Sequence, residues 1–220
     1  MTIRAVIFDM DGVLVDSEPT WVASEIEVFG RHGVHLTPEL CSQTRGMRVD
    51  AVARHWYARK PWKGAMVDDV AHEITNEVAR RLRQRAEPLP GAKTAPALVR
   101  QMGLRCALAS SSPMHIIDAV VDALNLREQL QELHSAEHHP QGKPHPAVYM
   151  AAAEALNVPP GECLAIEDSI TGLISARAAG MRTLAIPDPD RYDDPRFSIA
   201  HYRLRSLEPL QGLLSELTTL

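Results

Sequence analysis

The stretch Ala5–Gly12, AVIFDMDG, joins four apolar residues to two acids that have only Met10 between them. With the two residues before it, the apolar run forms IRAVIF over residues 3–8, a composition typical of a strand buried on both faces of a parallel sheet. The glycine that follows the second acid predicts a turn where this strand ends. Carboxylates as close as those of Asp9 and Asp11 repel each other, so the pattern indicates that a positive group lies nearby.

Three later stretches repeat this apolar, strand-like character. They are LRCALAS ending at Ser110, ECLAIED ending at Asp168 and MRTLAIP ending at Pro187. A stretch of helical character precedes each one, over residues 93–102, 146–156 and 170–179. Because strands and helices alternate, and crossovers between parallel strands are right-handed, we predict a doubly wound parallel α/β sheet.

Between the first strand and the turn EPLPGAKT, which begins at Glu87, the apolar residues recur at helical spacing. The recurring positions include Val70, Ile74, Val78 and Leu82. Trp21 and Trp56 belong to the same pattern and are expected to be core residues. We therefore predict an α-helical cap domain inserted into an α/β core domain. The core domain is expected over residues 1–16 and 88–220, and the cap domain over residues 17–87.

The composition is that of a globular protein. The chain has 220 residues, 45% of them hydrophobic and 23% charged, which suffices for one core and a smaller insert. The net charge of -5 gives no reason to expect nucleic acid or an anionic membrane as a partner. We expect a small-molecule partner and a monomer.

The cysteines indicate a reducing compartment. Cys41, Cys106 and Cys163 are widely spaced and form no C-x-x-C pair, so we expect three buried thiols in a cytoplasmic protein. Asp9 and Asp11 interrupt the apolar run near the N-terminus after a few residues. We therefore expect neither a signal peptide nor a membrane span there.

Polar side chains follow three of the predicted strands, at the edge where doubly wound sheets bind their ligands. Asp9 and Asp11, with Gly12 after them, follow the first strand. Ser110, Ser111 and Ser112 follow the second, and Glu167, Asp168 and Ser169 follow another. Lys143, in the loop QGKPHP, adds a cation. Ser112 precedes Pro113 and a helix, so it could cap that helix or contact a ligand. The pair Glu167 and Asp168 could also cap the helix that starts near Ile170.

This set of side chains suits a phosphoryl group held by Mg²⁺. Mg²⁺ takes oxygen ligands, usually one or two carboxylates together with water and substrate phosphate. A cation of this kind would also separate the repelling carboxylates. Lys143 and Ser110 would donate to phosphate oxygens, whose charge must be stabilised during transfer.

In this order, Asp9-Met-Asp11-Gly, Ser110, Lys143 in GKPHP and Glu167-Asp168 resemble the four motifs of the haloacid dehalogenase (HAD) superfamily. The helical insert after the first motif is similar to that superfamily's helical cap. Over nearly the whole chain the sequence resembles the subgroup that hydrolyses small sugar phosphates, in particular hexitol phosphatases and 2-deoxyglucose-6-phosphate phosphatases. The stretches that carry this closer likeness are LVDSEPTW, GMRVDAVARHWYARKPW, LASSSPMH and KPHPAVY.

The resemblance implies catalytic roles for two acids. Asp9 would attack phosphorus and form an aspartyl-phosphate, which divides one difficult displacement into two easier ones. Asp11 would protonate the leaving oxygen and then accept a proton from the water that opens the intermediate. Dehalogenases of the superfamily lack an acid two residues after the nucleophile, so we do not expect dehalogenation.

The resemblance also implies the binding residues. Mg²⁺ would be held by Asp9, the main-chain carbonyl of Asp11 and Asp168, with Glu167 acting through water. The phosphoryl group would be bound by Ser110, Ser111 and Lys143. Specificity would lie in the cap, where we place Glu18 and Arg48 at the substrate.

The motifs leave the reaction class open. A β-phosphoglucomutase-like phosphomutase would use the same residues and differ only in whether the aspartyl-phosphate meets water or a second sugar hydroxyl. A non-catalytic binding protein on the same scaffold is a third alternative, although this chain has no broken motif. The leading hypothesis is a Mg²⁺-dependent phosphatase acting on a small phosphorylated sugar or polyol.

Overall fold

The computed structural model, which describes residues 2–44 and 47–218, contains a parallel six-stranded sheet. The strand order is β3-β2-β1-β4-β5-β6, and each neighbouring pair is parallel. The strands are β1 (Ala5–Phe8), β2 (Arg105–Ser110), β3 (Glu132–Ser135), β4 (Cys163–Glu167), β5 (Arg182–Ala185) and β6 (Tyr202–Arg203). The predicted doubly wound α/β class is confirmed, with the AVIF stretch as one of the two central strands.

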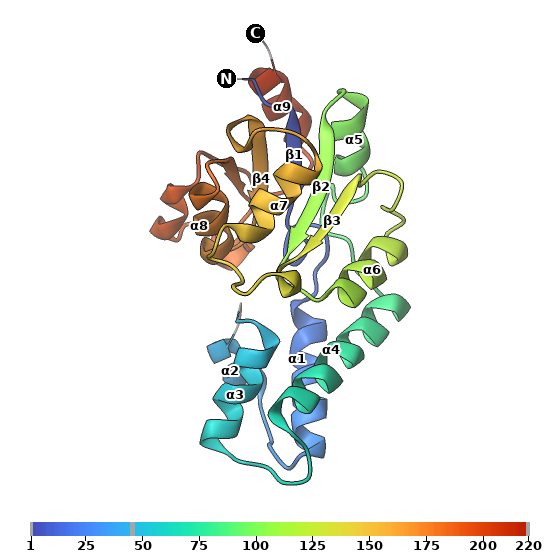
Figure 1. The fold of residues 1–220 in the computed structure, drawn as a ribbon, viewed down its shortest axis with the longest axis vertical. Coiled ribbons are helices and arrows are strands. Elements are labelled where there is room, and N and C mark those ends of the chain that lie inside the picture. Colours follow the sequence, from blue (N-terminus) through green and yellow to red (C-terminus); the bar gives the residue numbers. More distant parts are fainter. Residues whose placement is uncertain (1, 45–46, 219–220) are drawn as a thin grey trace.

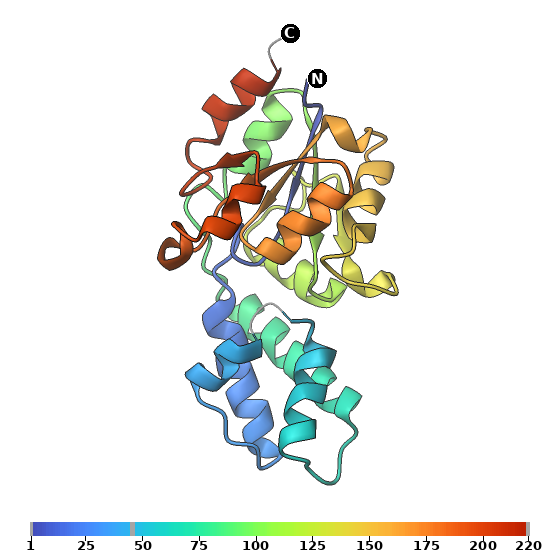
Figure 2. The same ribbon diagram turned by 90° about the vertical axis from the view of Figure 1, so that its left-hand side faces the viewer.

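Helices cover both faces of the sheet (Figures 1 and 2). They are α5 (Ala95–Gln101), α6 (Met114–Ala123), α7 (Ala147–Ala155), α8 (Ile170–Ala178) and α9 (Leu210–Thr218). Successive side chains of a strand point to opposite faces. In β1, Val6 and Phe8 therefore join the apolar cluster that contains α5, α6 and α9, whereas Ala5 and Ile7 join the cluster that contains α7 and α8.

The sheet face under α7 and α8 is lined largely by alanine. Ala5, Ala107, Ala109 and Ala165, on the adjacent strands β1, β2 and β4, are all fully buried there. Small side chains leave room for a large one, and Tyr149 of α7, which is also fully buried, packs in the same cluster. The alanines of this face thus make space for an aromatic residue next to the ends of β1 and β4.

Four helices follow β1 and lie apart from the sheet, beyond the edge at which its strands end (Figure 1). They are α1 (Glu18–Arg31), α2 (Pro38–Cys41), α3 (Val49–Arg59) and α4 (Val67–Gln84). The predicted periodicity is confirmed in α4, where Val70, Ile74, Val78 and Leu82 are fully buried. The division into two domains at residues 17 and 87 stays a prediction.

Several short elements were not predicted from the sequence. The strands β3 and β6 lie at the two edges of the sheet, and α2 is a single turn. An edge strand pairs on one side only and needs no continuous apolar run, so the sequence ELHS of β3 carries little strand signal. The short 3₁₀ helices are η1 (Ser42–Thr44), η2 (Ala136–His138), η3 (Pro160–Glu162), η4 (Pro189–Arg191) and η5 (Pro195–Ile199).

Two sequence expectations about the apolar interior can be compared with the structure. Cys41, Cys106 and Cys163 are buried free thiols, as expected. Trp56 is buried as expected, but the prediction for Trp21 is wrong, because this side chain is only partly buried and lies against a cavity.

Among the helices of residues 2–44 and 47–218, none has the length and apolar character needed to cross a membrane.

The alanine face gives a stability prediction. Replacing Ala107 with leucine should lower the free energy of unfolding by about 1–3 kcal/mol, because the added methylene groups overpack a filled interface. Chemical denaturation measures this change. The matched control is Ala58→Leu at an exposed position of α3, which should leave stability within about 0.5 kcal/mol. Equal stability of the two variants would show that the alanine face is not closely packed.

Candidate active site

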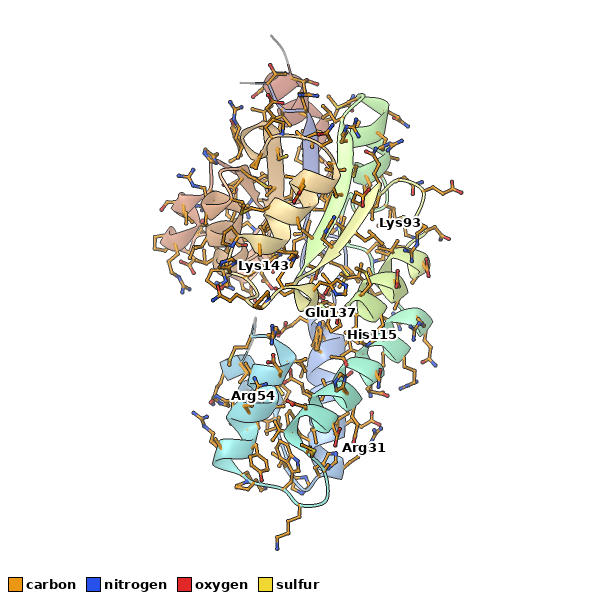
Figure 3. The ribbon with its side chains drawn as sticks, viewed as in Figure 1. Arg31, Arg54, Lys93, His115, Glu137 and Lys143 are labelled. Atoms are coloured by element: carbon orange, nitrogen blue, oxygen red, sulfur yellow. The ribbon has the colours of Figure 1, made fainter. Side chains whose placement is uncertain are left out.

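A cavity of about 1060 Å³ lies where the sheet edge meets the four helices of residues 18–84. All the predicted site residues except Glu167 line it: Asp9, Asp11, Glu18, Arg48, Ser110, Ser111, Lys143 and Asp168. Figure 3 places Lys143, Glu137 and His115 at this meeting of the sheet region with the helices. The carboxyl ends of β1, β2 and β4 therefore share one cavity with the helical segment, as is expected of a doubly wound sheet.

Asp9 is fixed by the register of the sheet. It follows β1 directly, and its backbone N–H donates to the carbonyl oxygen of Ile166 on β4 at 2.9 Å. Its side chain is 9% exposed. Burial, followed by the negative charge of Glu167, raises the pKa of Asp9 to about 8, although Lys143 opposes this shift.

Lys143 is the positive group between the buried acids. Its Nζ lies 2.8 Å from Asp9 Oδ1 and 2.6 Å from Glu167 Oε1, and it also donates to the carbonyl oxygen of Ala109 at 3.1 Å. Burial by itself lowers the pKa of Lys143, but the charges of Asp9 and Glu167 outweigh it and raise the pKa. The ammonium group is therefore charged and can also stabilise negative charge on a ligand next to Asp9.

The acidic residues fit a hard divalent cation such as Mg²⁺. Asp9, Glu167 and Asp168 each offer a carboxylate oxygen within 4.8 Å of the others. Burial, followed by the charges of Glu167 and Asp9, raises the pKa of Asp168 well above its ordinary value. Buried oxygen ligands that repel one another in this way are the donor set that Mg²⁺ prefers.

The turn after the second acid requires glycine. Gly12 has a φ of +76°, which side-chain-bearing residues rarely adopt, and a Cβ built there would lie 2.3 Å from Asp168 Oδ2. The glycine of the DMDG stretch therefore lets the backbone after Asp11 approach the carboxylate of Asp168. This approach brings the main-chain segment predicted to supply a metal ligand next to the acids.

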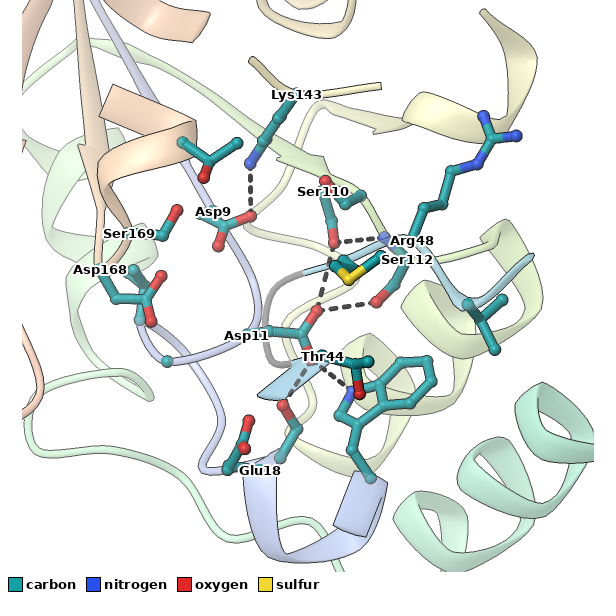
Figure 4. Close-up of a pocket in the computed structure, with 18 of the residues that line it drawn as sticks. Asp9, Asp11, Glu18, Thr44, Arg48, Ser110, Ser112, Lys143, Asp168 and Ser169 are labelled. Atoms are coloured by element: carbon teal, nitrogen blue, oxygen red, sulfur yellow. Dashed lines mark hydrogen bonds and ion pairs between the residues drawn. The ribbon is translucent and has the colours of Figure 1, made fainter. Parts of the chain in front are cut away.

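Asp11 is held by donors from both sides of the cavity. Ser17 Oγ and Trp21 Nε1, at the start of the helical segment, donate to Asp11 Oδ1, the latter at 3.3 Å. From the sheet side, Ser112 Oγ and Ser110 Oγ donate to Asp11 Oδ2 at 2.8 and 3.4 Å. These contacts, drawn in Figure 4, fix the orientation of the carboxylate between the two parts of the molecule.

The serines after β2 differ in role from one another. Ser110 is fully buried and also accepts a hydrogen bond from the Ser112 N–H at 3.0 Å. Ser111 is half-buried and lines the cavity, where a ligand can reach it. The N-cap alternative for Ser112 is wrong, since Pro113 occupies the cap position of α6 and the Ser112 hydroxyl is bonded to Asp11. Binding of a phosphoryl group by Ser110 and Ser111 stays a prediction.

Glu167 lies behind the cavity. It is fully buried and does not line the cavity; its Oε1 accepts from Lys143 and from the Tyr149 hydroxyl at 2.7 Å, and its Oε2 accepts from Ser169 Oγ at 3.0 Å. Gly172 of α8 packs so closely that a Cβ there would lie 1.8 Å from Glu167 Oε1. This carboxylate therefore orients Lys143, whether or not it also contacts a metal ion.

The helix α8 is capped by Ser169, whose side chain accepts from the Gly172 N–H at 3.0 Å. Neither Glu167 nor Asp168 is therefore its N-cap residue.

Tyr149 and Trp21 were missed as site residues in the sequence. Tyr149 lies on α7, six residues after Lys143, and the Lys143 ammonium also lies 4.9 Å from the centre of its ring. Burial, followed by the charge of Glu167, raises the pKa of Tyr149, so its hydroxyl remains a donor. A signal existed, because a tyrosine within the otherwise apolar stretch AVYMAAA must find a polar partner when it is buried. For Trp21, only its closeness to the first motif was a signal.

The two predicted specificity residues lie on the helical side of the cavity. Glu18 begins α1 below Asp11 in the view of Figure 4. Arg48 precedes α3, and its guanidinium points away from Asp9 and Asp11 in that view. It is paired with Asp50, with Nε 2.6 Å from Oδ1 and Nη2 2.8 Å from Oδ2. Contact of either residue with a substrate stays a prediction.

Comparison with known proteins shows that most of the chain is similar to haloacid dehalogenase-like hydrolases. The haloacid dehalogenase-like hydrolase family matches residues 3–180. Hexitol phosphatase B of Escherichia coli (strain K12) is 41% identical over 210 residues, covering 94% of each chain. Hexitol phosphatase A of the same organism is 30% identical over 213 residues, covering 96% of this chain and 94% of that protein. The crystal structure of CbbY from Rhodobacter sphaeroides in complex with phosphate has a TM-score of 0.84 at 25% identity, covering 94% of this chain and 96% of that chain.

The tyrosine contact gives a prediction about the site's stability. Tyr149→Phe should lower the free energy of unfolding by about 1–3 kcal/mol, because it removes one hydrogen-bond donor from the buried carboxylate of Glu167. The measurement is equilibrium denaturation in urea, beside Tyr57→Phe at an exposed position of α3, which should be neutral. A Tyr149→Phe variant as stable as the wild type would mean that the hydroxyl is not needed to satisfy Glu167.

Proposed function

The chain belongs to the haloacid dehalogenase-like hydrolases, and on that premise we propose that it is a phosphatase acting on small phosphorylated sugars or sugar alcohols. The observation that carries the proposal is the placement of Asp9. Its carboxylate is buried at the end of β1, lies 2.8 Å from the Lys143 ammonium and lines a cavity of about 1060 Å³. Two relatives named hexitol phosphatases support the substrate class.

In the first step an oxygen of Asp9 attacks the phosphorus of the substrate. The bond between phosphorus and the sugar oxygen breaks, and the leaving oxygen takes a proton from Asp11. Lys143 stabilises the negative charge of the transferring group from its place beside Asp9. Ser111, partly exposed in the cavity, is positioned to bind the same group.

In the second step water attacks the phosphorus of the aspartyl-phosphate. Asp11 accepts the proton of this water, the bond between Asp9 and phosphorus breaks, and phosphate leaves with both carboxyl groups restored. Four hydrogen bonds orient the Asp11 carboxyl group, which lines the cavity. The hydrogen bonds from Ser17 and Trp21 also join the acid to the first helix of the proposed cap domain.

Asp9, Asp168 and the main-chain carbonyl of Asp11 would hold Mg²⁺, with Glu167 behind them. When bound, Mg²⁺ neutralises carboxylate charge and lowers the repulsion between Asp9 and an incoming phosphate. The residues of the chain orient the substrate, attack phosphorus through Asp9 and move the proton through Asp11. We place the protein in the cytoplasm as a monomer, in keeping with its free buried thiols.

The proposal is tested by phosphate release from a panel of phosphate esters. The panel contains sorbitol, mannitol and 2-deoxyglucose 6-phosphates, a pentose phosphate, a glycolate phosphate and β-glucose 1-phosphate with a sugar bisphosphate. We expect release to be greatest with the 6-phosphates. Conversion of β-glucose 1-phosphate to the 6-phosphate with little free phosphate would instead identify a phosphomutase.

The nucleophile gives a sharp prediction within this panel. Asp9→Asn should lower kcat for phosphate release by about 10³-fold or more, because an amide cannot form the covalent intermediate. The control is Asp193→Asn, an exposed residue in the described part of the chain, which should retain full activity. Substantial turnover by Asp9→Asn with the fold intact would rule out this mechanism.

The metal gives a prediction that needs no substrate. Mg²⁺ at 100 times its dissociation constant should stabilise the wild-type protein by about 2.7 kcal/mol, since it binds only the folded state. Thermal unfolding with and without Mg²⁺ measures this shift. In Asp168→Asn the shift should fall sharply, whereas Asp193→Asn should keep it. Identical shifts in all three proteins would place the cation elsewhere.

A further inference from the structure

The helical side of the cavity contains a buried carboxyl group that the proposed reaction does not use. Glu25 of α1 is only 8% exposed, yet it lines the cavity. Its Oε2 is buried and, within residues 2–44 and 47–218, has no hydrogen-bond partner. A buried acceptor without a partner loses its hydration and gains nothing in return, so such groups in functional cavities mark places where a ligand can bind.

The helix α1 connects Glu25 with the reacting end of the cavity. Glu18, Trp21 and Glu25 are spaced three and four residues apart and line the cavity from one face of α1. Trp21 donates to Asp11, and Glu25 lies about 6 Å further along the helix at 1.5 Å per residue. A phosphorylated chain of several carbons reaching from Asp9 along this face would therefore bring its far end to Glu25.

Polar side chains of the described residues lie next to Glu25. The Cys41 thiol donates to the Glu25 carboxyl group. Thr44 is buried, lines the cavity and donates to the Cys41 carbonyl oxygen at 3.1 Å. Burial raises the pKa of Glu25 to about 7, with Glu18 adding to the shift, so the group can pair with a hydroxyl without burying a full charge. These three residues, Glu25, Cys41 and Thr44, are here called the polar floor.

The charges around the polar floor disfavour a second anion. Among the described residues of the helical segment, the charged groups that line the cavity are Glu18, Glu25, Asp50, Asp68, Arg48 and Arg54. Arg48 makes two hydrogen bonds to Asp50, and Arg54 lies 2.7 Å from Asp50 and 3.5 Å from Asp68, so the two arginines are paired with two carboxylates. A phosphate or carboxylate at the far end of a substrate would therefore have to compete with Asp50 and Asp68 for these arginines.

We propose that Glu25 is a specificity-determining residue that binds a distal hydroxyl of an uncharged polyol chain. This inference rests on the proposed phosphatase activity and deepens it. The hydroxyl occupies the unpartnered Oε2, and the cavity thereby selects phosphorylated polyols over esters that lack distal hydroxyls or carry a second anionic group there.

The test compares two phosphate esters of equal chain length. Sorbitol 6-phosphate carries hydroxyls along its chain, and hexyl phosphate carries none. Glu25→Met, which keeps the size of the side chain but removes its acceptors, should lower kcat/KM for sorbitol 6-phosphate about tenfold or more, mainly through KM. The same variant should leave hexyl phosphate hydrolysis within about twofold, and Glu25→Gln, which keeps one acceptor, should recover most of the loss.

The matched control is Glu27→Met on the same helix, because Glu27 does not line the cavity and pairs with Arg31 and Arg81 instead. It should leave the ratio of the two kcat/KM values unchanged. Equal losses on both esters in Glu25→Met, or no loss on sorbitol 6-phosphate, would overturn the role of Glu25 while the phosphatase activity stands. Hydrolysis of other esters of the panel but not of sorbitol 6-phosphate would also overturn the role of Glu25. Failure of the wild-type protein with every ester of the panel would overturn the proposed function itself.

A second comparison uses only the wild-type protein and so does not depend on whether a variant folds. 6-Phosphogluconate has the same carbon chain as sorbitol 6-phosphate with a carboxylate at the far end. We expect its kcat/KM to be at least about tenfold lower, because that carboxylate would lie beside the Glu25 carboxyl group, and Arg48 and Arg54 are already paired with acids. Equal or faster hydrolysis of 6-phosphogluconate would contradict the selection of an uncharged end.

Discussion

The ammonium group of Lys143 sits between the carboxylates of Asp9 and Glu167, and the arrangement of the sheet edge depends on this contact. All three side chains are at least nine-tenths buried, so each charge needs the others. Removing one partner of a buried ion pair typically costs about 3–5 kcal/mol, because it leaves an uncompensated charge. Glu167 is held in turn by Tyr149, which the alanine face accommodates. The pairing of Lys143 with the two acids is therefore linked, through Glu167 and Tyr149, to the small alanine side chains on one face of the sheet.

Much of the fold and of the reacting end could be predicted from the sequence, because the decisive residues are contiguous with strands. The apolar run before Asp9 predicts a buried strand, and the carboxyl ends of parallel strands meet at one edge. The edge strand β3 has no such run and was missed. Asp11 was recognised, but its partners Ser17, Trp21 and Ser112 were not, since these contacts come from tertiary packing and leave no periodicity.

Two parts of the molecule line the cavity, the sheet edge and the helical segment. In the proposed reaction the sheet edge supplies the groups that act on the phosphoryl group, and these would treat every phosphate ester alike. The helices place Glu18, Arg48 and the polar floor at the same cavity, and we propose that these residues contact the rest of the substrate. Hydrogen bonds from Ser17 and Trp21 to Asp11 join the two parts. The helical segment thereby bears on the proposed proton transfer as well as on substrate choice.

The central claim, covalent catalysis by Asp9, is tested most directly by the stereochemical course at phosphorus. The substrate would be a sugar alcohol phosphate made chiral at phosphorus with oxygen isotopes, hydrolysed in isotopically labelled water. Each in-line displacement inverts the configuration, so transfer to Asp9 followed by transfer to water predicts overall retention. Overall inversion would show that water attacks the substrate directly, and Asp9 would then not be the nucleophile.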